Sequence, residues 1–150
     1  MPVEKLKNYL DEHHTKYVTI THSPAYTSSE IAQSAHIPGR ELAKTVMVKA
    51  DGEIFMAVLP STKSVDLAKL QEATGASEVG IAKEEEFKEL FPNCETGAMP
   101  PFGNLYGLNV YVDPSLREDE EIAFNAGSHT ELIKLDYKDY ETLVSPKVMS

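Results

Sequence analysis

A chain of 150 residues is long enough for one domain that buries roughly two-thirds of its extended-chain surface. Hydrophobic residues make up 41% of it and charged residues 25%, as in an ordinary globular protein. No apolar run approaches the ~20 residues that cross a bilayer, residues 1–5 lack the apolar segment of a signal peptide, and Cys94 is the only cysteine. We therefore exclude a membrane-spanning helix and an internal disulfide framework, and expect one cytoplasmic domain over residues 1–150.

Acidic side chains outnumber basic ones by 24 to 14, so the net charge at pH 7 is −10. Proteins that bind a long stretch of nucleic acid usually present a basic face, because neutralised phosphates supply much of the affinity. The acids gather at 84–86 and 118–121, whereas residues 40–49 carry three cations against one acid, Glu41. This charge argues against an extended nucleic-acid interface, but it is compatible with an interface that recognises only the tip of a nucleic acid.

The first half of the chain predicts alternating helices and strands. Val3, Leu6, Tyr9 and Leu10 recur at helical spacing and predict an amphipathic helix that ends near His13-His14. Residues 17–21 are typical of a short strand, and a capping box at 27–30 predicts a helix that Pro38-Gly39 ends.

The clearest strand signal follows. Residues 46–49 alternate, Asp51-Gly52 supplies a turn, and residues 54–59 return as an apolar strand. We expect Ser64 to cap a helix that carries Leu67 and Leu70 and ends at Gly75. A strand over 78–82 and a helix over 83–91, ended by Pro92, come next.

Periodicity disappears from 93 to 107, and residues 97–103 are a loop by composition. Strands are predicted at 108–112, 122–124 and 132–135, and a last helix at 140–144. About seven strands and four or five helices without strict alternation indicate an α+β fold.

Lys44 is the first candidate for chemistry, since P-loop, dinucleotide-binding, esterase and zinc-protease signatures are absent. It lies at the root of a predicted strand. If partly buried there, its ammonium is a fixed positive group that can clamp a phosphate or stabilise an ester oxyanion. The alternative is a solvated lysine beside Glu41.

The loop at 97–103, Gly-Ala-Met-Pro-Pro-Phe-Gly, is the second candidate. Pro100 and Pro101 fix the backbone, and Gly97 and Gly103 allow a close approach to a ligand. Phe102 could stack on a base. The alternative is a turn that packs its own Phe and Met into the core.

The third candidate is the end of a predicted strand at 125–130. Gly127 can reverse the chain, so that Ser128 and His129 project from the strand terminus. A Ser–His catalytic pair is disfavoured, because adjacent residues of an extended chain point to opposite faces. His129 could orient a water or bind a substrate amine, or it could be structural. Cys94 has no local activating base, and no metal site is supported.

These three features occur in the same order as in the YbaK/ProX family, which the chain resembles from about Leu6 to Val144. That family comprises editing domains that are free-standing or inserted in bacterial prolyl-tRNA synthetase, and its most specific motif is G-x-x-P-P-F, which ends here at Phe102. The resemblance implies a compact mixed β-barrel with helices packed outside it. It also implies hydrolysis of the ester that joins an amino acid to the terminal adenosine of tRNA, with no metal or other cofactor.

The resemblance implies a catalytic role for Lys44, as a positive charge that polarises the ester carbonyl or holds the adenosine phosphate. Backbone amides of the loop would support the oxyanion, with water or the ribose hydroxyl as nucleophile. The residues expected to contact the substrate are Thr45, Gly97, Pro100, Pro101, Phe102, Gly103, Gly127, Ser128 and His129.

The identity of the amino acid stays open. Members that remove alanine from proline tRNA generally have Asn where this chain has Thr45. Thr45 is closer to the branch that favours cysteinyl-tRNA and to branches that act on serine or threonine esters, although the first often lacks the histidine at His129. The expected partner is a tRNA acceptor end, delivered by a synthetase or elongation factor, with no DNA or membrane. Alternatives are a non-catalytic tRNA-end or nucleotide binding module, and a small-molecule ester or thioester hydrolase that uses Cys94 or His129.

Overall fold

Helices and strands mix along the chain without a repeating β-α unit, which confirms the α+β class. The computed structural model describes residues 2–21, 41–87, 89, 99–127 and 131–148. The helix predicted after the capping box, the end of the helix predicted over 83–91, and Cys94 lie outside these residues. The elements are α1 (Pro2–Glu12), β1 (Tyr17–Thr21), β2 (Ala43–Ala50), β3 (Glu53–Pro60), α3 (Leu67–Thr74), β4 (Val79–Ile81), α4 (Glu84–Phe87), η3 (Gly103–Tyr106), β5 (Val110–Val112), η4 (Pro114–Glu118), β6 (Glu121–Asn125), β7 (Glu131–Asp136), α5 (Tyr137–Val144) and β8 (Lys147–Val148).

The strands form two open sheets. One has the order β1-β7-β6 and the other β4-β2-β3-β5-β8. Between them the described residues contain one isolated bridge, Leu42 with Ala123. The predicted closed β-barrel is therefore wrong for the described part of the chain, because closure requires hydrogen-bonded pairing around the whole circumference. The two-residue strand β8 was not predicted.

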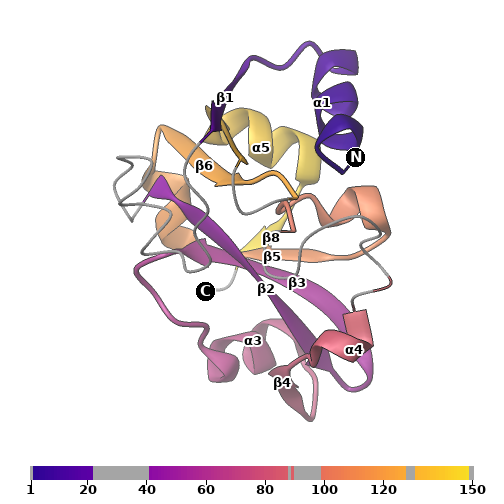
Figure 1. The fold of residues 1–150 in the computed structure, drawn as a ribbon. Coiled ribbons are helices and arrows are strands. Elements are labelled where there is room, and N and C mark those ends of the chain that lie inside the picture. The colour runs from indigo at the N-terminus through magenta and orange to yellow at the C-terminus, as the bar shows by residue number, and fades with distance from the viewer. Residues whose placement is uncertain (1, 22–40, 88, 90–98, 128–130, 149–150) are drawn as a thin grey trace.

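The β2–β3 hairpin divides the molecule into two cores. Asp51 and Gly52 turn the chain with φ of 47° and 88°, and eight residue pairs run without a break from Ala43–Pro60 to Ala50–Glu53. Because side chains alternate along a strand, one face of this hairpin belongs to each core. In Figure 1 the hairpin crosses the middle of the molecule, with α1 and α5 above it and α3 below it.

The main core contains side chains from both sheets and from α1 and α5. Its largest fully buried members include Leu6, Leu10, Phe102, Phe124 and Tyr140. The second core lies under α3 and consists of Val48, Ala50, Phe55, Ala57, Leu70 and Tyr111. None of the helices in the described residues is long and apolar enough to cross a membrane.

The caps of α3 explain its position along the chain. The N-cap is Asp66 and not the predicted Ser64, since the Asp66 carboxylate accepts hydrogen bonds from the backbone N–H of Ala68 and Lys69 at 3.1 and 3.2 Å. A carboxylate two residues later in the chain is an equally good cap, and sequence spacing alone did not separate the two. Gly75 ends the helix as predicted, with φ of 72°.

We predict that Gly103→Ala lowers the free energy of unfolding by about 1–3 kcal/mol, because the added methyl overpacks the site. A Cβ at Gly103 would lie 2.7 Å from Cγ2 of Val110 and 3.1 Å from the carbonyl oxygen of Leu108. Urea unfolding measures the loss. Gly80→Ala is the matched control, since a Cβ there meets no atom within 4 Å. Equal stability of the two variants would contradict this packing.

Candidate active site

Lys44 lies near the start of β2, opposite Leu59 of β3. Successive side chains of a strand point to opposite faces. On β2, Met47 belongs to the main core, whereas Val48 belongs to the second core and Val46 packs against it. Lys44 and Leu59 therefore face the same side of the sheet, the side opposite the main core.

The Lys44 side chain is partly buried, and this burial lowers the pKa of its ammonium below the usual 10.5. Among the residues that the structure describes, no hydrogen bond or ion pair neutralises it. Lys49 of the same strand differs in both respects, because it is exposed and forms an ion pair with Glu86 of α4. A partly desolvated ammonium without a protein counter-ion is available for a carbonyl or anionic group of a ligand.

Asn125, at the end of β6, is the expected neighbour of Lys44 on its other side. The bridge between Leu42 and Ala123 is parallel, and its register continued by two residues brings Asn125 level with Lys44. Phe124 belongs to the main core, so alternation turns Asn125 to the outer face that Lys44 occupies. Its Oδ1 is buried and has no hydrogen-bond partner in the described part of the chain. Asn125 is the first residue of the third candidate segment, 125–130, but the sequence analysis gives it no role of its own; its place two residues before the turn glycine is a signal.

The described part of the motif loop packs into the main core. Phe102 is 0% exposed, and its ring centroid lies 5.4 Å from those of Phe124 and Tyr140. The prediction that Phe102 can stack on a base is wrong, because neighbouring side chains cover the whole ring. The alternative, a turn that packs its own Phe and Met into the core, is confirmed, since Met99 is also buried.

Pro100 and Pro101 are buried as well, and they hold the loop in place. The hydroxyl of Tyr140 donates a hydrogen bond to the carbonyl oxygen of Pro101 at 2.8 Å. Gly103 then starts η3, in the close contact with Val110 described above. Met99 and Phe102 of this segment therefore belong to the main core. Gly97 lies outside the described residues.

The loop between β6 and β7 starts at Gly127, which is buried and has φ of 103°. The backbone N–H of Ala126 donates to the carbonyl of Glu131 at 3.1 Å, so the chain reverses here as predicted. Only a glycine adopts such a φ without strain. Ser128 and His129 follow this turn and lie outside the described residues.

Thr45 is half-buried and pairs with Val58, a main-core residue. Alternation therefore points it away from the face that carries Lys44. In the described residues, no three His, Cys, Asp or Glu side chains are grouped so that they could hold a metal ion.

Residues 22–143 match the family model of the aminoacyl-tRNA editing domain. The chain belongs to this family. The matched residues include Lys44, the loop at 97–103 and the strand end at 125–130. The YbaK/ProX assignment made from the sequence is therefore confirmed. Membership establishes aminoacyl-tRNA editing by deacylation as the activity class, with mischarged tRNA as the substrate class.

Two curated relatives are similar over most of their length. The multifunctional Ser/Thr-tRNA deacylase ProXp-y of Escherichia coli K12 is 26% identical over 152 residues, which cover 98% of this chain and 90% of the relative. The prolyl-tRNA editing protein ProX of Acetoanaerobium sticklandii is 26% identical over 141 residues, which cover 90% and 85%. The fold is similar to a crystal structure of a candidate trans-editing enzyme for prolyl-tRNA synthetase, with a TM-score of 0.82, 22% identity and coverage of 98% and 94%.

We predict that Lys44→Met raises the midpoint of urea unfolding at pH 7. The folded protein holds the Lys44 proton less tightly than the unfolded chain, where the pKa returns to about 10.5. The charged lysine therefore lowers stability below its folded-state pKa, and this deficit disappears as the pH rises to the unfolded-state value. The gain from methionine should shrink between pH 7 and pH 10.

Lys49→Met is the control for this experiment, because Lys49 is exposed and already paired with Glu86. It should give no gain at pH 7. A Lys44→Met protein that is less stable than wild type at pH 7 would show that the Lys44 charge is well solvated or neutralised in the folded state.

Proposed function

We propose that this protein is a trans-editing hydrolase of the cytoplasm that removes a small amino acid, such as Cys, Ala, Ser or Thr, from mischarged tRNA. The observation that carries the proposal is Lys44, a partly buried ammonium without a counter-ion among the described residues. It belongs to a chain of the aminoacyl-tRNA editing family. The naming of the E. coli relative as a Ser/Thr-tRNA deacylase supports the choice of small hydroxyl amino acids.

Lys44 is the proposed catalytic residue. Its ammonium donates a hydrogen bond to the ester carbonyl oxygen and stabilises the oxyanion as the tetrahedral intermediate forms. Water attacks the carbonyl carbon, with the neighbouring ribose hydroxyl helping to position it. The C–O bond to the adenosine then breaks, and the proton that the water loses passes to the leaving ribose oxygen. An ester has a tolerable leaving group, so positioning and charge stabilisation are sufficient, and the reaction as proposed needs no metal.

Two further groups are proposed to support Lys44. Met99 and Phe102 pack into the main core and Tyr140 holds the carbonyl of Pro101, so the loop is held in place, and its role as a source of backbone amides for the oxyanion stays a prediction. Asn125 is the second group. Its buried Oδ1 can accept a hydrogen bond from the attacking water or from the α-amino group of the ester.

The remaining expected contacts stay predictions. Gly97, Ser128 and His129 are proposed to border the aminoacyl group from the loops that lead to Met99 and follow Gly127. Thr45 is proposed to influence the choice of amino acid through packing behind Lys44. The partner is the tRNA acceptor end, and the acidic protein is expected to receive it from a synthetase or elongation factor.

We predict that Lys44→Ala lowers kcat/KM for the preferred misacylated tRNA by about 10²-fold or more, the usual loss of an oxyanion-stabilising donor. The measurement is release of labelled amino acid from a panel of Cys-, Ala-, Ser- and Thr-acylated tRNAs. Lys49→Ala, from the same strand, should keep the wild-type rate. Full activity of Lys44→Ala, or tight binding of every substrate without release, would contradict the proposal.

A second prediction concerns metal ions. Because Lys44 supplies the positive charge in the proposed step, prior dialysis of the enzyme against EDTA should leave kcat/KM within about twofold of the untreated value in a matched assay buffer. A large loss that added Zn²⁺ or Mg²⁺ restores would assign the oxyanion to a metal.

A further inference from the structure

A hollow of about 280 Å³ is lined by residues of β3, of the β3–α3 connection and of α3. One wall is Leu59, the cross-strand partner of Lys44, and directly opposed side chains in an antiparallel pair have Cβ atoms about 4.5–5.5 Å apart. The connection from β3 to α3 forms another wall. This connection is tied to the strand that carries Lys44, since the backbone N–H of Ser61 donates to the carbonyl of Leu42 at 2.8 Å. The hollow therefore lies beside the strand that carries Lys44.

Two lysines and two aspartates line this hollow, but the aspartates are already engaged. Asp66 caps α3 through the backbone N–H groups of Ala68 and Lys69. Asp113 accepts hydrogen bonds from the backbone N–H and hydroxyl of Ser115 at 2.9 and 2.7 Å. Burial alone would raise the pKa of Asp113, but these hydrogen bonds and the Lys63 ammonium lower it below its usual value.

The ammonium groups of the two lysines form weaker ion pairs or none among the described residues. Nζ of Lys63 lies 3.4 Å from Oδ1 of Asp113, and the Lys63 side chain is 51% exposed, so this ion pair is weak. Lys69 is exposed, and in the described part of the chain its ammonium has no ion pair. These two lysines line a hollow beside the strand that carries Lys44, in a protein whose net charge is −10.

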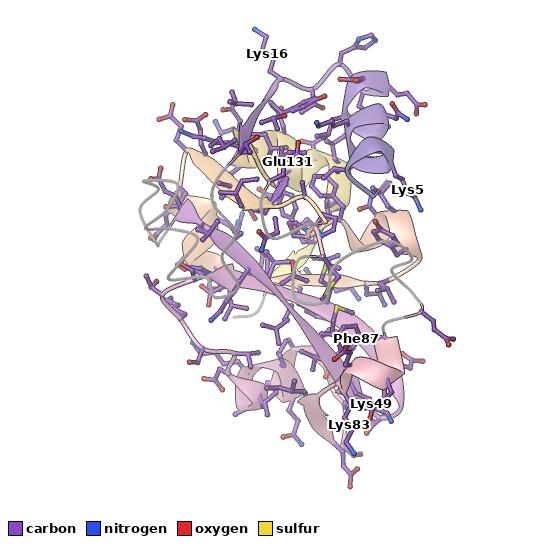
Figure 2. All side chains as sticks on the ribbon, viewed as in Figure 1. Lys5, Lys16, Lys49, Lys83, Phe87 and Glu131 are labelled. Atoms are coloured by element: carbon purple, nitrogen blue, oxygen red, sulfur yellow. The ribbon has the colours of Figure 1, made fainter. Side chains whose placement is uncertain are left out.

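A larger hollow of about 660 Å³ gives a contrast. It is lined by residues of η4, of α5 and of the segment before each of β6 and α5, and five acidic side chains line it against Arg117 and Lys138. A nucleic-acid strand would be repelled there, whereas the hollow with Lys63 and Lys69 offers one weakly paired ammonium and one without an ion pair among the described residues. In Figure 2, which has the same view as Figure 1, the exposed Lys16 lies at the opposite end of the molecule from α3.

We propose that the hollow formed by Leu59, the β3–α3 connection and α3 holds the single-stranded 3′ end of the tRNA, with Lys63 and Lys69 contacting the phosphates just before the terminal adenosine. This inference rests on the proposed function, because it starts from an ester held at Lys44. It gives this acidic protein a surface on which the 3′ end of the tRNA can bind. Neither lysine touches the ester, so both are positioning residues for the RNA strand.

The test compares two substrates that carry the same amino acid. One is the full misacylated tRNA, and the other is the 3′-aminoacyl ester of adenosine, which has no phosphate. The variants are Lys63→Gln, Lys69→Gln and the double variant, with Lys16→Gln as the control of equal charge change. Unfolding midpoints show that each variant is folded.

The double variant should lose about 10-fold or more in kcat/KM on the tRNA, chiefly through KM, and stay within about twofold of wild type on aminoacyl-adenosine. The slope of log kcat/KM against log salt should become shallower by about 0.7 for each lost phosphate contact. Lys16→Gln should change neither quantity. An equal loss on both substrates, or an unchanged rate and salt slope on the tRNA, would overturn the assignment.

Failure of the proposed function gives a different result, because the wild-type protein would then hydrolyse neither substrate. In that event, fluorescence anisotropy with a labelled single-stranded RNA that ends in CCA tests this binding surface directly. Several-fold weaker binding by the double variant, with unchanged binding by Lys16→Gln, would support the assignment. Equal binding by wild type and the double variant, or no binding by either, would refute it.

Discussion

The unbroken antiparallel pairing of β2 with β3 is the constraint on which the rest of the structure depends. Eight consecutive pairs leave no bulge, so the alternation of side chains holds from Ala43 to Ala50. The hydrophobic residues at alternate positions fill two separate cores, one on each face. Shifting the register by one residue would exchange Met47 with Val48 and turn Lys44 into the main core, where its charge would be unpaired. The packing of both cores therefore determines which way Lys44 points.

Much of the fold could be predicted from local patterns. The β2–β3 hairpin has alternating apolar residues around Asp51-Gly52, and Gly75 and Gly127 stand where the chain needs a left-handed or strongly bent backbone. What could not be predicted is that the two sheets stay open and do not close into a barrel. A barrel differs from two open sheets by pairings between strands far apart in sequence, and nothing local to β6 or β1 specifies these.

The candidate site shows the same limit. Lys44 could be chosen from the sequence, because a lysine at the root of an apolar strand conflicts with its surroundings. Phe102 was misjudged, since composition identifies a Gly-Pro loop but not the ring partners Phe124 and Tyr140 that bury it. Asn125 was missed for the opposite reason. Its significance depends on the Leu42–Ala123 bridge, the isolated bridge among the described residues, which joins residues 81 positions apart.

That bridge has a mechanical consequence. Lys44 belongs to the five-stranded sheet and Asn125 to the three-stranded sheet, and in the described residues Leu42–Ala123 is the one β-bridge between them. The two side chains therefore stand on opposite sides of a seam rather than within one continuous lattice of hydrogen bonds. A small rotation of one sheet against the other widens or narrows the gap between them while each sheet keeps its own pairing intact. The spacing of Lys44 and Asn125 is thus a property of how the two sheets splay, and residues that pack across the seam tune it.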